Sequence, residues 1–231
     1  MYPSQTVLTA QTALNKAIVQ VAKSYASRLD QQSAEHVQAT LDMLSHGNRC
    51  SRLMLILATK LQRVAPEDEF EPDAMAFGAF YHDIGKCCVP VKLLLAPRRL
   101  STQEYEIVKA HTNYGREIAE VAVSLLPRPH QGLTCLHAMA ACHHERWDGT
   151  GYPNRLIGEA IPFPARVMAI LDTYDAVRSS RAYKAGLSHS LACEEIEAGM
   201  GRAYDPDIAR CFLSSTRFFV HLLPELASRP F

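Results

Sequence analysis

The sequence of 231 residues predicts an all-α, compact fold that forms a single domain. Three observations predict it. Apolar residues recur at steps of three and four along most of the chain, which places them on one face of a helix. Serine and aspartate stand where several of these stripes begin, as helix caps do. No stretch shows the alternation of a half-buried strand, so the expected architecture is a bundle of helices.

The first two helices follow from their apolar stripes. Residues 6–29 carry one stripe, so residues 1–32 are assigned as an N-terminal helix or linker and 33–231 as the main domain. A second stripe runs from Val37 to Val64, where Gly47-Asn48 is expected to interrupt or bend the helix. The stretch from Pro66 to Pro72 is acidic and poor in apolar residues, so a surface loop is expected there.

The next elements are predicted by their caps. Asp73 is expected to cap a helix that continues towards Ile84. Ser101 and Glu104 stand at the spacing of a capping box, and the helix they begin is expected to carry His111. Residues 135–144 are small and apolar, which predicts a buried helix that ends in two histidines.

The C-terminal half begins with an irregular stretch. Residues 149–165 contain three prolines and three glycines, which predicts a long irregular loop. Apolar residues from Val167 to Tyr174 then mark a helix with Asp172 in its middle. Asp205 followed by Pro206 predicts an N-cap and the first turn of the last helix.

Composition narrows the class of protein. The formal net charge is zero, so no general nucleic-acid or anionic-membrane surface is expected. No apolar run reaches the roughly 18–20 residues of a membrane span, and no secretory signal is recognisable. Seven cysteines in no paired spacing suit free thiols in a reducing cytoplasm, which is the expected location.

Histidines and aspartates lie beside apolar stripes on separate segments, where an ionisable group is costly unless it is paired or bound to a metal. They are His46, His82, Asp83, His111, His143, His144 and Asp172. Histidine with carboxylate suits iron, manganese, cobalt, nickel or zinc. Seven ligands are too many for a site with a single metal ion that keeps coordination positions open. They suit two metals about 3.5–4 Å apart, an arrangement that activates water against a phosphoester.

Ordered motifs surround these residues. They are His-Asp-Ile-Gly-Lys at 82–86, His111-Thr112 with Gly115, the stretch 143–153 that ends in Gly-Thr-Gly-Tyr-Pro, Asp172-Thr173-Tyr174-Asp175, and Arg181-Ala182-Tyr183-Lys184. Together, in register from about residue 36 to residue 213, they resemble the HD-GYP subfamily of the HD superfamily of metal-dependent phosphohydrolases. The resemblance implies an HD-type catalytic domain within residues 33–231. It also implies a bacterial cyclic-di-GMP phosphodiesterase that forms linear pGpG and often GMP.

The same resemblance assigns roles to single residues. The seven histidines and aspartates become metal ligands, with Asp83 as a bridge, and a metal-bridging hydroxide attacks phosphorus. Lys86, which lies beside the metals, becomes catalytic by donating to a phosphate oxygen or to the leaving oxygen. Asp83, the bridging ligand, is catalytic as well. The substrate-binding residues become Gly151, Tyr152, Arg181 and Lys184. Two divalent ions are expected, iron or manganese, while nickel, cobalt and zinc remain open.

The chain departs from the family pattern at two places. Members with a third metal often carry a glutamate four residues before the first histidine, where this chain has Asp42. Asp42 is therefore a candidate ligand of a third metal, but its shorter side chain favours two. Asn154-Arg155 follows the Gly-Tyr-Pro where many members have a glycine, which changes the expected loop shape.

Alternatives to this enzyme stay open. One is a cyclic-dinucleotide binding or signalling module with little turnover, and another is a hydrolase of cyclic GMP–AMP. A GGDEF-type cyclase, an upstream sensory domain and a second copy in a homodimer are the candidate partners. His137, two helix periods before His144, is expected in the core or in a supporting role near the site.

Overall fold

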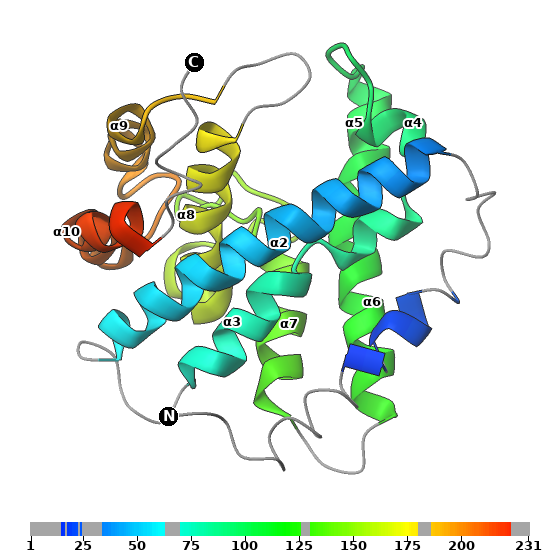
Figure 1. Cartoon of the computed structure of the whole chain (residues 1–231), viewed down its shortest axis with the longest axis horizontal. Coiled ribbons are helices and arrows are strands. Elements are labelled where there is room, and N and C mark those ends of the chain that lie inside the picture. Colours follow the sequence, from blue (N-terminus) through cyan, green and yellow to red (C-terminus); the bar gives the residue numbers. More distant parts are fainter. Residues whose placement is uncertain are drawn as a thin grey trace.

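The predicted all-α class is confirmed by a computed structural model of the chain, which describes residues 15–16, 18–22, 24, 34–62, 70–125, 130–179 and 186–222. Every regular element in these ranges is a helix (Figure 1). The described residues between 15 and 24 are helical as well, and they lie beside α6. The segment 63–69, most of the expected surface loop, lies outside the described residues, while Phe70 directly after it is buried.

The long helix α2 (Ala34–Leu61) crosses the molecule in front of α3 and α8 (Figure 1). The expected interruption at Gly47-Asn48 is wrong, because α2 continues through both residues. Gly47 serves a close approach of two helices instead. A Cβ at this position would lie 2.3 Å from the carbonyl oxygen of Phe80 in α3. The absence of a side chain there lets the two helices pack tightly at the level of His46.

The central elements differ from expectation in their boundaries. They are α3 (Pro72–Tyr81), the 3₁₀ helix η1 (Ile84–Cys88), α4 (Val91–Leu94), α5 (Thr102–Lys109) and α6 (His111–Ser124). Glu71 is the N-cap of α3, and Asp73 lies in its first turn because Pro72 already occupies the first helical position. The capping box of Ser101 and Glu104 is confirmed. The helix that it begins ends at Lys109, so His111 begins α6 instead of lying within α5.

The remaining elements are α7 (Gln131–Cys142), the 3₁₀ turn η2 (Gly158–Ala160), α8 (Phe163–Arg178), α9 (His189–Gly199) and α10 (Pro206–Leu222). The irregular stretch between α7 and α8 ends at Pro162, since α8 already begins at Phe163. Asp205 caps α10 as expected, because its Oδ1 accepts hydrogen bonds from the amides of Asp207 and Ile208.

Two large apolar cores and one small cluster, of Ala141, Cys142, Ile161 and Ala165, hold the described helices together. The larger core joins α2 and α3 to α8, α9 and α10 through side chains such as Leu57, Tyr174 and Phe212. The smaller core joins α6 and α7 to the described helical residues Ile18 and Val21. Residues 143–145 lead out of α7, where His143 and Glu145 are buried and His144 is partly exposed.

Within the described ranges, no helix combines the length and the apolar character needed to cross a bilayer. The boundary between residues 32 and 33 stays a prediction. Buried Ile18 and Val21 pack against side chains of α6 and α7 in the smaller core.

Candidate metal centre

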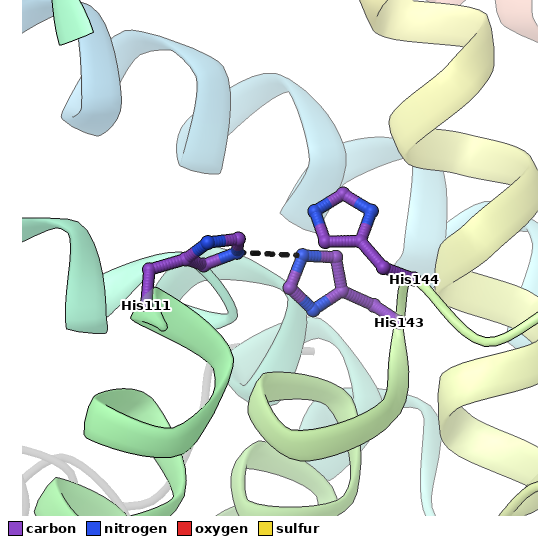
Figure 2. Close-up of side chains that lie close together, drawn as sticks. All are labelled: His111, His143 and His144. Carbon is purple, nitrogen blue, oxygen red and sulfur yellow. Dashed lines mark hydrogen bonds between the residues drawn. The ribbon is translucent and has the colours of Figure 1, made fainter. Parts of the chain in front are cut away.

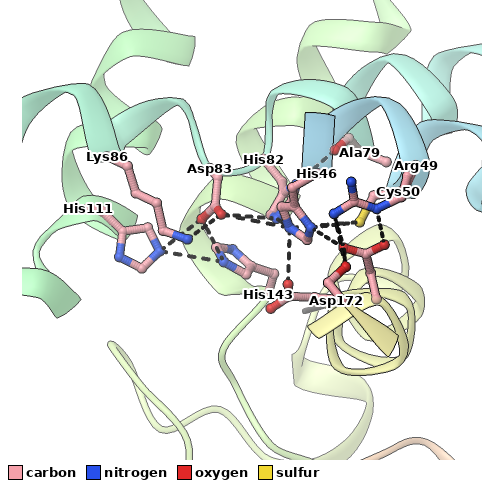
Figure 3. Close-up of polar contacts among 12 residues, drawn as sticks. His46, Arg49, Cys50, Ala79, His82, Asp83, Lys86, His111, His143 and Asp172 are labelled. Atoms are coloured by element: carbon pink, nitrogen blue, oxygen red, sulfur yellow. Dashed lines mark hydrogen bonds and ion pairs between the residues drawn. The ribbon is translucent and has the colours of Figure 1, made fainter. Parts of the chain in front are cut away.

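Five regions of the chain bring the predicted ligands to one place (Figure 3). His46 projects from the middle of α2, and Asp172 projects from the middle of α8. His82 is the C-cap of α3, and Asp83 follows it as the N-cap of η1. The other three ligands are His111 at the start of α6 and the pair His143-His144 directly after α7. All seven predicted ligands are therefore contributed by helix ends or helix centres around one point.

The turn that holds Asp83 lies against the start of α6. A Cβ on Gly85 would lie 2.0 Å from the carbonyl oxygen of His111 and 2.5 Å from the amide nitrogen of Gly115. Only a glycine therefore fits at this position without moving one of the two elements. This contact brings Asp83 next to His111.

The carboxylate of Asp83 separates two groups of imidazole nitrogens. Its Oδ2 lies 3.6 Å from Nε2 of His82 and 3.9 Å from Nε2 of His46. Its Oδ1 lies 3.4 Å from Nε2 of His111 and 3.6 Å from Nε2 of His143. Each oxygen thus faces its own pair of histidines, which is the geometry of a bridging carboxylate.

The remaining ligands complete the two groups. Asp172 Oδ1 lies 3.2 Å from Nε2 of His46, on the side of the first pair. His144 lies beside the second pair, with its ring centroid 4.0 Å from that of His143 and 5.2 Å from that of His111 (Figure 2). Among the described residues, two clusters of ligand atoms close enough to hold an ion follow this division: His46, His82 and Asp83, and His111, His143 and His144. A further cluster, of His82, His143 and Asp172, joins the two groups.

The second ring nitrogen of four histidines is already engaged. Nδ1 of His82, His111 and His143 each lies 2.7 Å from a backbone carbonyl, of Ala79, Val108 and Met139 respectively. Nδ1 of His46 lies 2.7 Å from Oδ2 of Asp175. Because these partners can only accept, Nδ1 carries the proton. In a neutral ring Nε2 then presents a lone pair, as in a metal ligand.

Burial keeps most of these rings neutral. It lowers the pKa of His82 to about 3 and the pKa of His111 to about 4. It also lowers the pKa of His144 well below its usual value. For His46 burial lowers the pKa, but Cys50, Asp172 and Asp175 raise it by more, so the pKa lies well above the usual value. The carboxylates of Asp172 and Asp175 therefore favour a positive charge at His46.

The two predicted carboxylate ligands are held in the ionised form. Burial raises the pKa of Asp83, yet Lys86 and the neighbouring histidines lower it further, to well below its usual value. The Nζ of Lys86 donates a hydrogen bond to Oδ2 of Asp83. Burial likewise raises the pKa of Asp172, and His46 with the other histidines reverses the effect. Both side chains are thus anionic acceptors that a cation would stabilise.

Divalent metals fit this set of residues. Asp83 Oδ1 is buried and accepts no hydrogen bond within the described part of the chain, although a buried charged oxygen without a partner is costly. Nε2 of His46 lies 3.2 Å from Nε2 of His82, and Nε2 of His111 lies 3.5 Å from Nε2 of His143. Facing lone pairs at these distances repel each other unless a cation or a proton lies between them. Imidazole with carboxylate is a donor set for transition metals.

A cleft opens onto the second group of ligands. Its volume is about 360 Å³, and its lining includes His143, His144, Asp172, Gly151 and Tyr152. The ring of Tyr152 stacks on that of His144 with centroids 4.8 Å apart. Gly151 and Tyr152, expected to border the substrate, therefore lie at the opening to the metal ligands. Arg181 and Lys184, expected to bind phosphate, lie outside the described residues.

Two predicted residues lie apart from the ligands. Asp42 is exposed one turn before His46, accepts a hydrogen bond from Gln38, and joins no metal-binding cluster of the described residues. His137 is wrongly expected in the core or near the site. Its side chain is 42% exposed, and its Nε2 lies 3.2 Å from Glu120 on the outer face of α6.

The predictions missed several supporting residues. Asp175 accepts hydrogen bonds from His46 and Arg49, and the fully buried Cys50 places its Sγ 3.6 Å from Nδ1 of His46. Glu145 is buried and accepts hydrogen bonds from the amides of Asn154 and Leu156, which ties the loop to the histidine pair. The spacing of Asp172 and Asp175, one helical turn apart, is the signal that could have pointed to Asp175.

Comparison with known proteins identifies the relatives of this arrangement. The profile of the HD domain family matches residues 12–208. A cyclic di-GMP phosphodiesterase of Vibrio cholerae is 40% identical over 139 residues, which cover 60% of this chain and 28% of that protein. A 3'3'-cGAMP-specific phosphodiesterase 2 of the same organism is 35% identical over 158 residues, 68% of this chain and 29% of that protein. The chain thus spans less than a third of either relative.

A third relative and a solved structure agree with these matches. A cyclic di-GMP phosphodiesterase of Thermotoga maritima is 40% identical over 59% of this chain and 36% of its own length. The structure of Bd1817, an HDG"Y"P protein from Bdellovibrio bacteriovorus, matches with a TM-score of 0.57 and 17% identity. It covers 88% of this chain and 63% of its own. The expected resemblance is confirmed, and the solved structure supports the fold.

Proposed function

Because the chain belongs to the HD domain family and resembles its HD-GYP members, we propose that it hydrolyses cyclic di-GMP to linear pGpG and onward to GMP. The observation that carries this proposal is the position of Asp83, whose two oxygens each face a separate pair of imidazole Nε2 atoms. Such an arrangement suits two metal ions that share one carboxylate, which is one way in which enzymes catalyse phosphoester hydrolysis.

The residues that would hold the two ions follow from the geometry. The first ion would be held by His46, His82, Asp172 and Oδ2 of Asp83. The second would be held by His111, His143, His144 and Oδ1 of Asp83. Bound divalent cations supply Lewis acidity and lower the pKa of water at the site. We propose iron or manganese, because histidine with carboxylate suits both metals.

The remaining chemistry belongs to the protein. Lys86 reaches Oδ2 of Asp83 while a third of its side chain stays exposed, so its ammonium lies between the ligands and the solvent. From there it can donate to a phosphate oxygen or protonate the leaving oxygen. Tyr152, stacked on His144, borders the entrance, and Gly151 lets the loop pack against the backbone of Arg146, 2.3 Å from where a Cβ would lie. Arg181 and Lys184 stay predicted phosphate ligands.

Hydrolysis of cyclic GMP–AMP is the second candidate function. A relative named as specific for 3'3'-cGAMP is 35% identical over 68% of this chain, a share comparable to that of the cyclic di-GMP enzymes. The ligands and Lys86 address phosphate, which both dinucleotides contain, so the described site favours neither base. A binding module with little turnover is the alternative outside the enzymes.

The test is turnover of both dinucleotides by the same preparation. The purified chain is stripped of metal with a chelator, reloaded with manganese or ferrous iron, and incubated with cyclic di-GMP or 3'3'-cGAMP. Chromatography should show linear pGpG followed by GMP from cyclic di-GMP, and no product from the stripped protein. Binding without product in the loaded protein would establish the binding module. Faster turnover of 3'3'-cGAMP than of cyclic di-GMP would make 3'3'-cGAMP the preferred substrate.

The location is proposed from the cysteines, and the partners from the substrate. We propose that the chain acts in the cytoplasm, since none of its seven cysteines forms a disulfide, as a reducing compartment would keep them. A GGDEF-type cyclase, an upstream sensory domain and a second copy of the chain stay predicted partners. Each would control how much cyclic dinucleotide reaches the cleft.

A further inference from the structure

A lysine lies between two tyrosine rings at the cleft. Lys109 is the last residue of α5, and its Nζ lies 5.0 Å from the ring centroid of Tyr105 and 5.1 Å from that of Tyr152. The two rings meet edge to face with centroids 6.4 Å apart. All three side chains line the same cleft as His143, His144 and Asp172. A cation is therefore held at the opening by two aromatic faces, one from α5 and one from the loop after α7.

This ammonium is separate from the metal ligands. The neighbouring histidine His111 is anchored through the carbonyl of Val108, and Thr112 is anchored through the carbonyl of Lys109, so Lys109 supports this part of the site through its backbone and not through its ammonium. The side chain of Lys109 pairs with Glu106, with 2.7 Å between Nζ and Oε1, and 61% of the Glu106 side chain is exposed. Exposed pairs of this kind contribute little free energy, so an anion in the cleft can replace Glu106.

The contents of the cleft indicate which anion Lys109 would bind. Of its two carboxylates, Glu145 accepts hydrogen bonds from two amides of the loop, and Asp172 faces His46. Both carboxylates therefore have other partners, and the ammonium of Lys109 does not hold either of them in place. A cyclic dinucleotide carries two phosphodiesters, and only one can lie at the metals during a turnover. The other phosphodiester would enter the same cleft, where its negative charge favours a cation. Two cationic side chains line the cleft, Lys109 and Arg146, and Arg146 already lies 3.6 Å from the carboxylate of Asp148.

We propose that Lys109 binds the phosphate of the cyclic dinucleotide that is not being cleaved, and that Tyr105 and Tyr152 hold its ammonium in position. This inference rests on the proposed function and deepens it. Lys109 thereby favours substrates with two phosphodiesters over substrates with one. The contact is an ammonium–phosphate hydrogen bond that forms before the reaction and is unchanged by it, so it contributes to substrate binding.

The test compares a substrate with two phosphodiesters and one with a single phosphodiester. Lys109→Met keeps the aliphatic stem between the rings and removes the charge. In the manganese-loaded chain it should raise KM for cyclic di-GMP about tenfold while kcat stays within about twofold, the loss of one charged contact. KM for bis(p-nitrophenyl) phosphate and the metal content should not change. Lys109→Arg should restore most of the affinity, and Lys92→Met, at an exposed lysine of α4, is the matched control.

The outcomes separate this inference from the proposed function. An unchanged KM for cyclic di-GMP in Lys109→Met, or an equal rise for both substrates, would overturn the role of Lys109. If the unaltered chain binds cyclic di-GMP without hydrolysing it, the enzyme proposal fails, and calorimetry decides the inference instead. Lys109→Met should then weaken binding of cyclic di-GMP about tenfold. If the unaltered chain neither binds nor hydrolyses it, both proposals are wrong.

Discussion

His46 hydrogen-bonds through Nδ1 to Oδ2 of Asp175 over 2.7 Å, and Asp175 is itself buried beneath Arg49. Arg49 donates to both oxygens of this carboxylate, from Nε over 2.6 Å and from Nη2 over 2.8 Å. Burial raises the pKa of Asp175, but Arg49 and His46 lower it further, so the carboxylate stays ionised. Among the four predicted ligand histidines with a described Nδ1 partner, His46 alone relies on a side chain for its hydrogen bond.

Asp175→Asn should therefore weaken metal binding on the side of His46. An amide accepts a weaker hydrogen bond from Nδ1 and no longer neutralises Arg49, so the ring loses both orientation and basicity. We expect affinity for one of two manganese ions to fall about 10–100-fold, as for other residues that support ligands. Titration against a competing chelator measures it. Asp207→Asn, at a carboxylate paired only with exposed Arg210, is the control. Equal affinities in both variants would leave Asp175 no part in the centre.

Asp83→Ala should abolish both metal occupancy and turnover. The substitution removes the oxygen that faces each histidine pair and leaves two cations without the anion between them. Elemental analysis of the purified variant should find less than one ion per chain. Asp83→Asn retains a single neutral oxygen and should hold at most one. Two retained ions in the alanine variant would contradict the bridging arrangement, and circular dichroism checks that it remains folded.

Lys86→Met should slow the reaction without removing the metals. Its ammonium contacts Asp83 but is no ligand, so the variant keeps the imidazoles and carboxylates in place. We expect kcat for cyclic di-GMP to fall about 100-fold or more, the usual contribution of a positioned proton donor. Metal content should match that of the unaltered chain. A kcat within twofold of that chain would assign proton donation to another group.

Asp42→Ala should leave the number of metals unchanged. Asp42 is exposed, and its hydrogen bond comes from Gln38 on the same helix. We expect two ions per chain before and after the substitution, with a change in unfolding free energy below about 0.5 kcal/mol. Metal analysis after loading with excess manganese provides the count. A decrease from three ions to two would make Asp42 a ligand of a third metal.

Glu104→Gln should destabilise the chain in a pH-dependent manner. Hydrogen bonds from Arg98 and from the amide of Ser101 lower the pKa of Glu104 from its usual 4.5 to about 2. A lowered pKa means that Glu104 stabilises the fold above pH 4.5 and that this contribution is lost as pH falls towards 2. The variant should melt at a lower temperature at pH 7, and the difference should vanish near pH 2. Glu159→Gln, at an exposed glutamate of η2, should show no such difference.

Much of the fold could be predicted because its signals are local. The capping box at Ser101, the cap at Asp205 and the helix around Asp172 each depend on residues within one or two turns. The wrong boundaries also have local causes. Gly47 looks like a helix breaker along the chain, but it lies where Phe80 of another helix needs the space. Sequence spacing alone does not contain that contact.

The site could be predicted only as far as its motifs extend. Adjacent His82 and Asp83 marked the ligands, but the division of Asp83 between two histidine pairs depends on the contact of η1 with α6. The support of His46 by Asp175 joins α2 to α8, which lie far apart in the sequence. Lys109 and Tyr105 stand one turn apart on α5, and nothing in that spacing indicates that they face Tyr152.

The continuity of α2 makes His46 mechanically continuous with the start of the helix near Ala34. At about 1.5 Å per residue, 28 residues form a rod of roughly 42 Å with a metal ligand near its middle. The close contact at Gly47, one residue after His46, limits how near α2 can lie to α3. The position of His46 relative to His82 and Asp83 is therefore tied to the placement of the whole helix, and not only to the residues next to it in the sequence.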